Sequence, residues 1–248
     1  DRLIRPMMKG ADGWKEVEWS IALQAAAEAF KVVMGKHGAD GVGALASPNA
    51  TIEELYLLNK LVRTLGSNNI DTRLRQSDTS ADARISGARW LGMKVAEIGG
   101  LQSVLVIGST LRKEQPLIAN RLRQAAKKGL EVNVLHAADD DLLMKVANKS
   151  IVRPSALALE LAGVAKALVE LKGASLPGEV ANAVAGISVS AGARAIAGSL
   201  AAKEKTAVWL GGVAQSHPDY TLMHVLAQEI ARIAGGTFGV LIGSANAV

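Results

Sequence analysis

The chain has 248 residues, 49% of them hydrophobic and 21% charged, which excludes an intrinsically disordered tail and suits one large α/β domain or two small ones. It contains no cysteine, which excludes disulfides, cysteine-ligated zinc and iron–sulfur clusters held by these residues, and only 3% aromatic residues with which to stack nucleic-acid bases. The net charge of +5 indicates a solvated basic surface or an anionic partner protein, and we expect no nucleic-acid partner and no direct membrane insertion.

The N-terminal residues predict a strand followed by a helix. Residues 14–19 (WKEVEW) alternate apolar and polar side chains, as a half-buried strand does. Ser20 is then expected to cap an Ala-rich helix that ends before Gly38. Because the sequence starts at Asp1 and runs directly into this pattern, we expect it to be an internal piece of a longer polypeptide.

A second strand and helix follow. Residues 41–46 are small and apolar, as in a buried parallel strand. Thr51 and Glu54 have the spacing of a capping box, in which each side chain accepts a hydrogen bond from a backbone N–H of the first turn. The leucines after them predict a helix that stops at Gly66. Residues 67–100 are less regular, and this long excursion is a candidate binding loop.

A strand–helix–strand unit is predicted in the middle of the chain. Residues 103–107 (SVLVI) form a fully apolar strand, a helix follows at residues 116–128, and the next strand is expected at residues 131–135. Such a unit is right-handed by default. The three aspartates at 139–141 are predicted to open another helix, where carboxylates oppose the positive end of the helix dipole.

The last part of the chain continues the alternation of helices and strands. The predicted elements are a helix at 155–171, a linker at 173–178, a helix at 190–202, a strand at 206–210 and a helix at 219–234. Glu160 and Lys166 make the first of these helices too charged to span a membrane. Strand–helix alternation without hairpin signals predicts an open parallel α/β fold.

Two glycine junctions are the candidate ligand sites. Gly108-Ser109 and Gly211-Gly212 each follow a predicted strand, at the position where open parallel sheets hold phosphates on helix N-termini. Neither junction reads G-x-G-x-x-G, so glycines that only permit close helix–strand packing remain an alternative explanation. The four histidines form no pattern with metal-ligand spacing, and we expect no metal site from them.

Several segments resemble the molybdopterin oxidoreductase superfamily, and they follow the family's order over nearly the whole chain. They are residues 2–20, 43–71, 104–129 and 206–215. The resemblance implies an α/β fold with two Rossmann-like parallel-sheet lobes, as in formate dehydrogenase and DMSO reductase. It implies that residues 1–36 are a strand and helix joining the second lobe, residues 37–175 the first lobe, and residues 176–248 a truncated second lobe. Because a truncated lobe leaves a face uncovered, an apolar patch is expected near residues 237–248.

The resemblance also implies positions for a pterin cofactor. Ser77 falls where the family has its metal ligand, and Arg75 matches an arginine two residues before that ligand. If a pterin binds, the residues expected to contact it are Ser77, Gly108, Ser109, Gly211 and Gly212.

Three departures from the family pattern argue against such a cofactor. Thr110 replaces the asparagine of Gly-x-Asn, His136 replaces the acidic residue of Asp-Pro-Arg, and Leu157 replaces the aspartate that pairs with guanine. Each missing partner of a buried guanine costs about 1–3 kcal/mol. We therefore expect no catalytic residue, no cofactor contact and no metal ligand in these residues.

Within the superfamily, residues 104–129 resemble the large iron–sulfur (G) subunits of bacterial NADH:quinone oxidoreductase, respiratory complex I. This resemblance implies a non-catalytic scaffold, iron–sulfur clusters in a region N-terminal to these residues, and other hydrophilic subunits of the complex as partners. It also implies a place in the peripheral arm, at the cytoplasmic face of the bacterial inner membrane. Two alternatives stay open, a molybdopterin-dependent oxidoreductase core with Ser77 as metal ligand and a nucleotide-binding module at Gly108 or Gly211.

Overall fold

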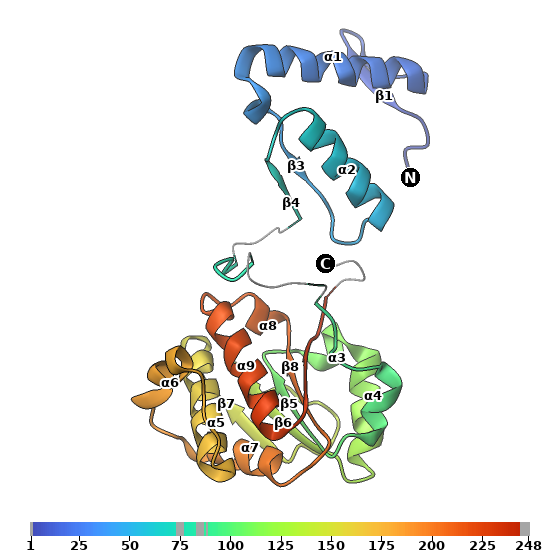
Figure 1. Cartoon of the computed structure of the whole chain (residues 1–248). Coiled ribbons are helices and arrows are strands. Elements are labelled where there is room, and N and C mark those ends of the chain that lie inside the picture. The colour runs from blue at the N-terminus through green and yellow to red at the C-terminus, as the bar shows by residue number, and fades with distance from the viewer. Residues whose placement is uncertain (1, 73–76, 83–86, 88, 244–248) are drawn as a thin grey trace. The chain divides into compact units, whose positions relative to one another are not determined.

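The computed structural model describes residues 2–72, 77–82, 87 and 89–243. The chain divides into two compact units, residues 1–74 and residues 75–248. Figure 1 shows the elements of both units in chain order.

The first unit contains two small sheets and two helices. Its elements are β1 (Met7–Gly10), β2 (Gly13–Glu16), α1 (Trp19–His37), the 3-10 helix η1 (Ala39–Gly41), β3 (Ala44–Leu45), α2 (Ile52–Thr64) and β4 (Ile70–Asp71). Strands β1 and β2 form an antiparallel hairpin, whereas β3 and β4 pair in parallel. The core of this unit is small, because none of the residues of α1 is buried and Val62 alone is buried in α2.

Local signals in the first unit are confirmed in part. Thr51 Oγ1 accepts a hydrogen bond from Glu54 N–H at 3.2 Å, and Glu54 Oε2 accepts one from Thr51 N–H at 2.8 Å, so the predicted capping box is present. The strand predicted at 14–19 is shorter than expected, because β2 ends at Glu16. The cap predicted at Ser20 is wrong, since α1 starts at Trp19 and the residue before the helix makes no side-chain capping bond.

The second unit is built on a five-stranded parallel sheet with the order β7-β6-β5-β8-β9 (Figure 1). The strands are β5 (Ser103–Ile107), β6 (Glu131–His136), β7 (Asn148–Ile151), β8 (Thr206–Leu210) and β9 (Thr237–Val240). Every residue of β5 and β8 is buried, and both strands have the bounds that their apolar runs predict. The α/β fold class with a parallel sheet is therefore confirmed.

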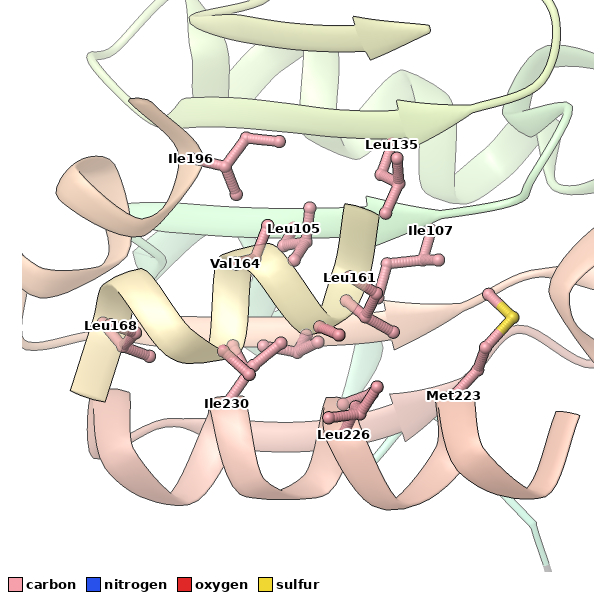
Figure 2. Packing of buried hydrophobic residues seen from close by; sticks show 14 of the residues in the cluster. Leu105, Ile107, Leu135, Leu161, Val164, Leu168, Ile196, Met223, Leu226 and Ile230 are labelled. Atoms are coloured by element: carbon pink, nitrogen blue, oxygen red, sulfur yellow. The ribbon is translucent and has the colours of Figure 1, made fainter. Parts of the chain in front are cut away.

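Helices cover both faces of this sheet. The α-helices are α3 (Leu111–Glu114), α4 (Pro116–Ala126), α5 (Leu157–Lys172), α6 (Gly178–Ala185), α7 (Ala191–Ala201), α8 (Gly212–Gln215) and α9 (Tyr220–Ala234), and the 3-10 helices are η2 (Val95–Gly100) and η3 (Pro154–Ala156). One apolar cluster joins α5, α7 and α9 to the sheet, and Figure 2 shows Leu161, Val164 and Ile230 in it. A second cluster joins α3 and α4 to the opposite face.

The prediction of a helix that begins at Asp139–Asp141 is wrong. The chain from residue 137 to 147 contains bends and no helix, and it leads into β7, which the sequence analysis did not predict. Asp141 Oδ1 accepts a hydrogen bond from Leu143 N–H at 2.8 Å, and Asp139 pairs with Lys149 at 2.6 Å. These carboxylates thus stabilise a turn and a strand contact, which compete with helix formation.

The observed division of the chain differs from the predicted one. The predicted boundary at 175/176 falls within the five-stranded sheet, because β5, β6 and β7 lie before it and β8 and β9 lie after it. The division seen at 74/75 does not coincide with the predicted boundary at 36/37 either.

The prediction of an apolar patch near residues 237–248 is wrong for the described part of that range. Val240 and Leu241 are each only 3% exposed, because β9 pairs with β8 and its end packs into the core. Among the described residues, no helix is both long and apolar enough to cross a membrane.

Candidate functional site

The candidate site lies where β5 and β8 end. In the order β7-β6-β5-β8-β9, the chain leaves β5 toward β6 on one side and leaves β8 toward β9 on the other. Such a reversal is the topological switch point at which open parallel sheets bind ligands. Gly108 directly follows β5 and Gly211 directly follows β8, so the fold brings the two predicted junctions together.

The two junctions are packed directly against each other. Gly211 N–H donates to Ile107 O at 2.7 Å, and Val213 N–H donates to Gly108 O at 2.9 Å. A Cβ atom on Gly211 would lie 2.2 Å from Ser109 Cβ and 2.5 Å from Gly108 O. Gly108 has a φ of +59°, and a Cβ atom there would lie 2.7 Å from Ala214 N. Close backbone contact therefore accounts for both glycines.

A carboxylate accepts hydrogen bonds from the donors that follow β5. Glu114 Oε2 accepts a hydrogen bond from Ser109 Oγ at 3.0 Å and one from Thr110 N–H at 3.1 Å. A Cβ atom on Gly212 would lie 3.2 Å from Glu114 Oε1, so the same carboxylate also lies beside the second junction. Backbone and hydroxyl donors at such a junction are the groups that would bind a ligand phosphate. Here the chain's own Glu114 takes them.

A second carboxylate binds the N-terminal turn of α9, the helix that follows β8. Asp78 Oδ2 accepts a hydrogen bond from Thr221 N–H at 2.8 Å. Asp78 Oδ1 accepts from Ser80 Oγ at 2.6 Å and from Ser80 N–H at 3.0 Å. The hydrogen bonds from Ser80 and Thr221 hold the pKa of the Asp78 carboxyl well below its usual range. Asp78 is therefore an anion at physiological pH and supplies the negative charge that this helix end favours.

Ser77 is half-buried and lies next to Asp78, while Arg75 lies outside the described residues. Within the described ranges, no group of three or more His, Cys, Asp or Glu residues is arranged to hold a metal ion. Ser77 thus directly precedes the carboxylate that binds the N-terminal turn of α9. Its role as a metal ligand stays a prediction.

Two of the three positions predicted to have lost nucleotide contacts, His136 and Leu157, face inward. His136 ends β6 and is 5% exposed, and its Nδ1 accepts a hydrogen bond from Ala138 N–H at 2.8 Å. Leu157 begins α5, is fully buried and belongs to the apolar cluster under that helix. Neither side chain offers an acidic oxygen to a nucleoside.

Two further buried titratable residues, Tyr220 and His224, pack against each other in α9. His224 lies edge-on between Tyr220 and Phe238, with ring centroids 5.7 Å and 4.8 Å away. Burial, followed by the nearby Arg89, lowers the pKa of His224, and burial raises the pKa of Tyr220. Both groups are therefore neutral at pH 7 and stabilise the core rather than hold an anion.

Comparison with known proteins identifies the family. The molybdopterin oxidoreductase family profile matches residues 2–247, which is nearly the whole chain. The chain belongs to the molybdopterin oxidoreductase family. Its fold is similar to that of acetylene hydratase from Pelobacter acetylenicus, with a TM-score of 0.70 at 20% identity, over 95% of this chain and 36% of that chain.

Curated relatives within the molybdopterin oxidoreductase family are redox proteins. The NADPH-Fe(3+) oxidoreductase subunit alpha of Geobacter sulfurreducens is 33% identical over 175 residues, which cover 68% of this chain and 20% of the relative. The F420-dependent formate dehydrogenase subunit alpha of Methanocaldococcus jannaschii is 33% identical over 139 residues, which cover 54% of this chain and 20% of the relative. The chain thus spans about a fifth of the length of these two relatives.

The residues at the switch point do not fit the nucleotide end of the family's cofactor. A pyrophosphate would need the donors of Ser109 and Thr110, which bond to Glu114, and it would meet the negative charge of that carboxylate. The N-terminal turn of α9 already binds Asp78. Leu157 lies in the apolar core, where it cannot accept a hydrogen bond from guanine.

The two carboxylates that occupy the hydrogen-bond donors at the switch point, Glu114 and Asp78, were not predicted from the sequence. Glu114 could have been found, because a glutamate four residues after Thr110 is within reach of an unpaired N–H at a helix start. Asp78 could not have been found in this way, because its partner Thr221 is 143 residues away.

Proposed function

We propose that this chain is a non-catalytic scaffold portion of the large iron–sulfur (G) subunit of bacterial NADH:quinone oxidoreductase, respiratory complex I. In this proposal, electrons pass from NADH toward quinone through iron–sulfur clusters outside these residues, and the chain itself holds no cofactor. Its partners are other hydrophilic subunits of the peripheral arm, at the cytoplasmic face of the inner membrane.

The observation that carries the scaffold role is the bonding of Glu114 at the switch point. This carboxylate accepts the hydrogen bonds of Ser109 and Thr110, and the glycines of both junctions are in backbone contact. A ligand phosphate would have to displace an internal anion and separate two packed turns. The resemblance of residues 104–129 to the complex I subunit supports the assignment within the family.

Analysis of the intact parent protein for cofactors tests this proposal. We expect plasma mass spectrometry of the purified complex to find iron but no stoichiometric molybdenum or tungsten, and oxidised extracts to lack pterin fluorescence. One molybdenum or tungsten and one pterin per chain would overturn the scaffold role. Absence of NADH:quinone reductase activity from the purified parent protein would overturn the assignment to complex I.

A second candidate function is a molybdopterin-dependent oxidoreductase core. It is favoured by the formate dehydrogenase relative and by Ser77, a half-buried residue that the sequence resemblance matches to the family's metal ligand. Under this alternative, Ser77→Ala removes the metal from the purified parent protein, whereas Ser80→Ala leaves it bound. Equal metal content, at background level, in the parent protein and both variants would exclude it.

A further inference from the structure

A surface groove of about 480 Å³ lies between η2 and α4 in the second unit. Figure 1 shows α4 on the face of the five-stranded sheet opposite α5 and α9. Val95 and Leu117 supply large apolar side chains to the groove, and Arg121 and Lys128 supply its charges. The groove is therefore an apolar surface with a cationic wall.

The apolar side chains of the groove are exposed to solvent. Leu117 is 79% exposed although it lies in the first turn of α4, and Val95 is 42% exposed. Single exposed leucines are ordinary, but here two apolar side chains line one concave surface. Covering them would remove apolar area from water, which favours association.

The charge around α4 is strongly one-sided. Residues 111–128 contain six basic side chains and a single acidic one, Glu114. The Glu114 carboxylate bonds to Ser109 and Thr110, and the Glu97 carboxylate of η2 bonds to Lys94 N–H at 3.1 Å. Among the ion pairs of the described residues, none includes any of these six cations. Residues 111–128 therefore present cations that have no acidic partner among the described ion pairs.

The spacing of the charged residues indicates what would match them. Arg121 and Lys128 are both exposed, and Arg121 lies in α4, whereas Lys128 lies in the turn that directly follows this helix. Leu117 precedes Arg121 by one turn. A partner helix with a large apolar side chain one turn before a carboxylate, and a second carboxylate beyond it, presents its groups in the same order.

We propose that this groove docks an acidic helical segment of another protein chain. The segment places an apolar side chain against Val95 and Leu117, and its carboxylates pair with Arg121 and Lys128. The proposal adds a docking surface and a partner chemistry to the proposed scaffold role. It rests on that role only where it identifies the partner as another subunit.

A designed peptide tests the groove directly. The probe is a capped, fluorescein-labelled helical peptide of about five turns, with glutamates at positions i and i+7 and leucine at i−4, one turn before the first glutamate, on a neutral background. We expect saturable binding to the full chain by fluorescence anisotropy. The double reversal Arg121→Glu with Lys128→Glu should weaken binding about tenfold or more, and Leu117→Ser should weaken it severalfold.

Matched controls separate docking from general attraction to a basic protein. The reversal Lys172→Glu with Lys205→Glu changes the net charge equally at two exposed positions outside the groove, and it should leave affinity within about twofold. A peptide with glutamine in place of both glutamates should bind at least about tenfold more weakly.

Three results would overturn the docking proposal. They are no binding at millimolar peptide, equal loss of affinity in the two double reversals, and tighter binding of a mixed-sequence DNA duplex that displaces the peptide from the groove. Each of these leaves metal and pterin content unchanged, so failure of the docking surface is distinguishable from failure of the scaffold role.

Discussion

Helices α1 and α5 are both rich in alanine and apolar residues, yet they differ completely in burial. Nine of the sixteen residues of α5 are buried against the sheet and its neighbouring helices, whereas none of the nineteen residues of α1 is buried. Trp19 and Leu23 of α1 are each 63% exposed. Apolar composition alone therefore does not build a core, because burial needs a complementary surface. The five-stranded sheet provides such a surface for α5.

A substitution in the buried face of α5 should reduce the stability of the protein most. Replacing Leu161, a fully buried residue of α5, by alanine should lower the free energy of unfolding by about 2–5 kcal/mol, because it removes apolar contacts and leaves a cavity. Leu23→Ala in α1 should change it by less than about 0.5 kcal/mol. Urea unfolding followed by circular dichroism measures both, and equal losses would contradict the burial difference.

A side chain added at the switch point should cause the next largest loss of stability. Gly211→Ala places a methyl group 2.2 Å from Ser109 Cβ, so the two junctions must separate, at a cost of about 1–3 kcal/mol of stability. Gly198→Ala in α7 is the matched control, because nothing lies within 4 Å of its added Cβ, and it should stabilise the protein by about 0.5–1 kcal/mol. Thermal unfolding compares the stability of the two variants with that of the wild type. Unchanged stability of Gly211→Ala would show that the junctions are loosely packed.

The capping of α9 by Asp78 should give a pH-dependent effect. Asp78→Asn should cost about 1 kcal/mol at pH 7, as loss of a helix cap does. The folded state holds the pKa of Asp78 below its unfolded value near 4, so this contribution is fully present above pH 4 and is lost as the pH falls further. Urea unfolding at pH 7 and at pH 3 should show the gap between the wild type and the variant narrowing.

Asp12→Asn is the control for that pH series. Asp12 belongs to the first unit and forms an exposed pair with Lys15, and such pairs contribute little. Its substitution should change stability by less than about 0.5 kcal/mol at either pH. A gap for Asp78→Asn that widens toward pH 3 would show that the carboxylate does not stabilise the folded state as an anion.

Substitution of Glu114 should change the free energy of unfolding only modestly. Glu114→Gln keeps the length of the side chain but weakens the bonds to Ser109 and Thr110, and it should cost about 0.5–1.5 kcal/mol. Glu204→Gln, at an exposed position outside the site, should be neutral within about 0.5 kcal/mol. Chemical unfolding separates the two, and identical midpoints would remove Glu114 from the description of the closed junction.

The sequence predicts the sheet best where a strand is wholly apolar. Residues 103–107 and 206–210 became strands with the predicted bounds, because a run buried on both faces has no other stable place. Strand β9 was missed, since Gly239 interrupts its pattern. That glycine is required by the close approach of Leu91, whose carbonyl oxygen would lie 1.9 Å from an added Cβ.

The sequence predicts where the two glycine junctions lie, after β5 and β8, but not which residues surround them. The glycines at 108 and 211 marked the strand ends correctly, since a tight turn after a buried strand leaves a local signal. The residues that fill the site depend on tertiary structure instead. Asp78 reaches Thr221 only after the chain has folded, and the contact of Gly211 with Ser109 joins two separate strand–helix units.

Calorimetric titration of guanosine diphosphate into the full chain tests most directly whether the switch point is closed by its own carboxylates. We predict no measurable heat of specific binding at millimolar ligand, because Glu114 holds the donors after β5 and Asp78 holds the N-terminal turn of α9. Saturable one-to-one binding with a micromolar dissociation constant, lost in Gly211→Ala, would contradict it.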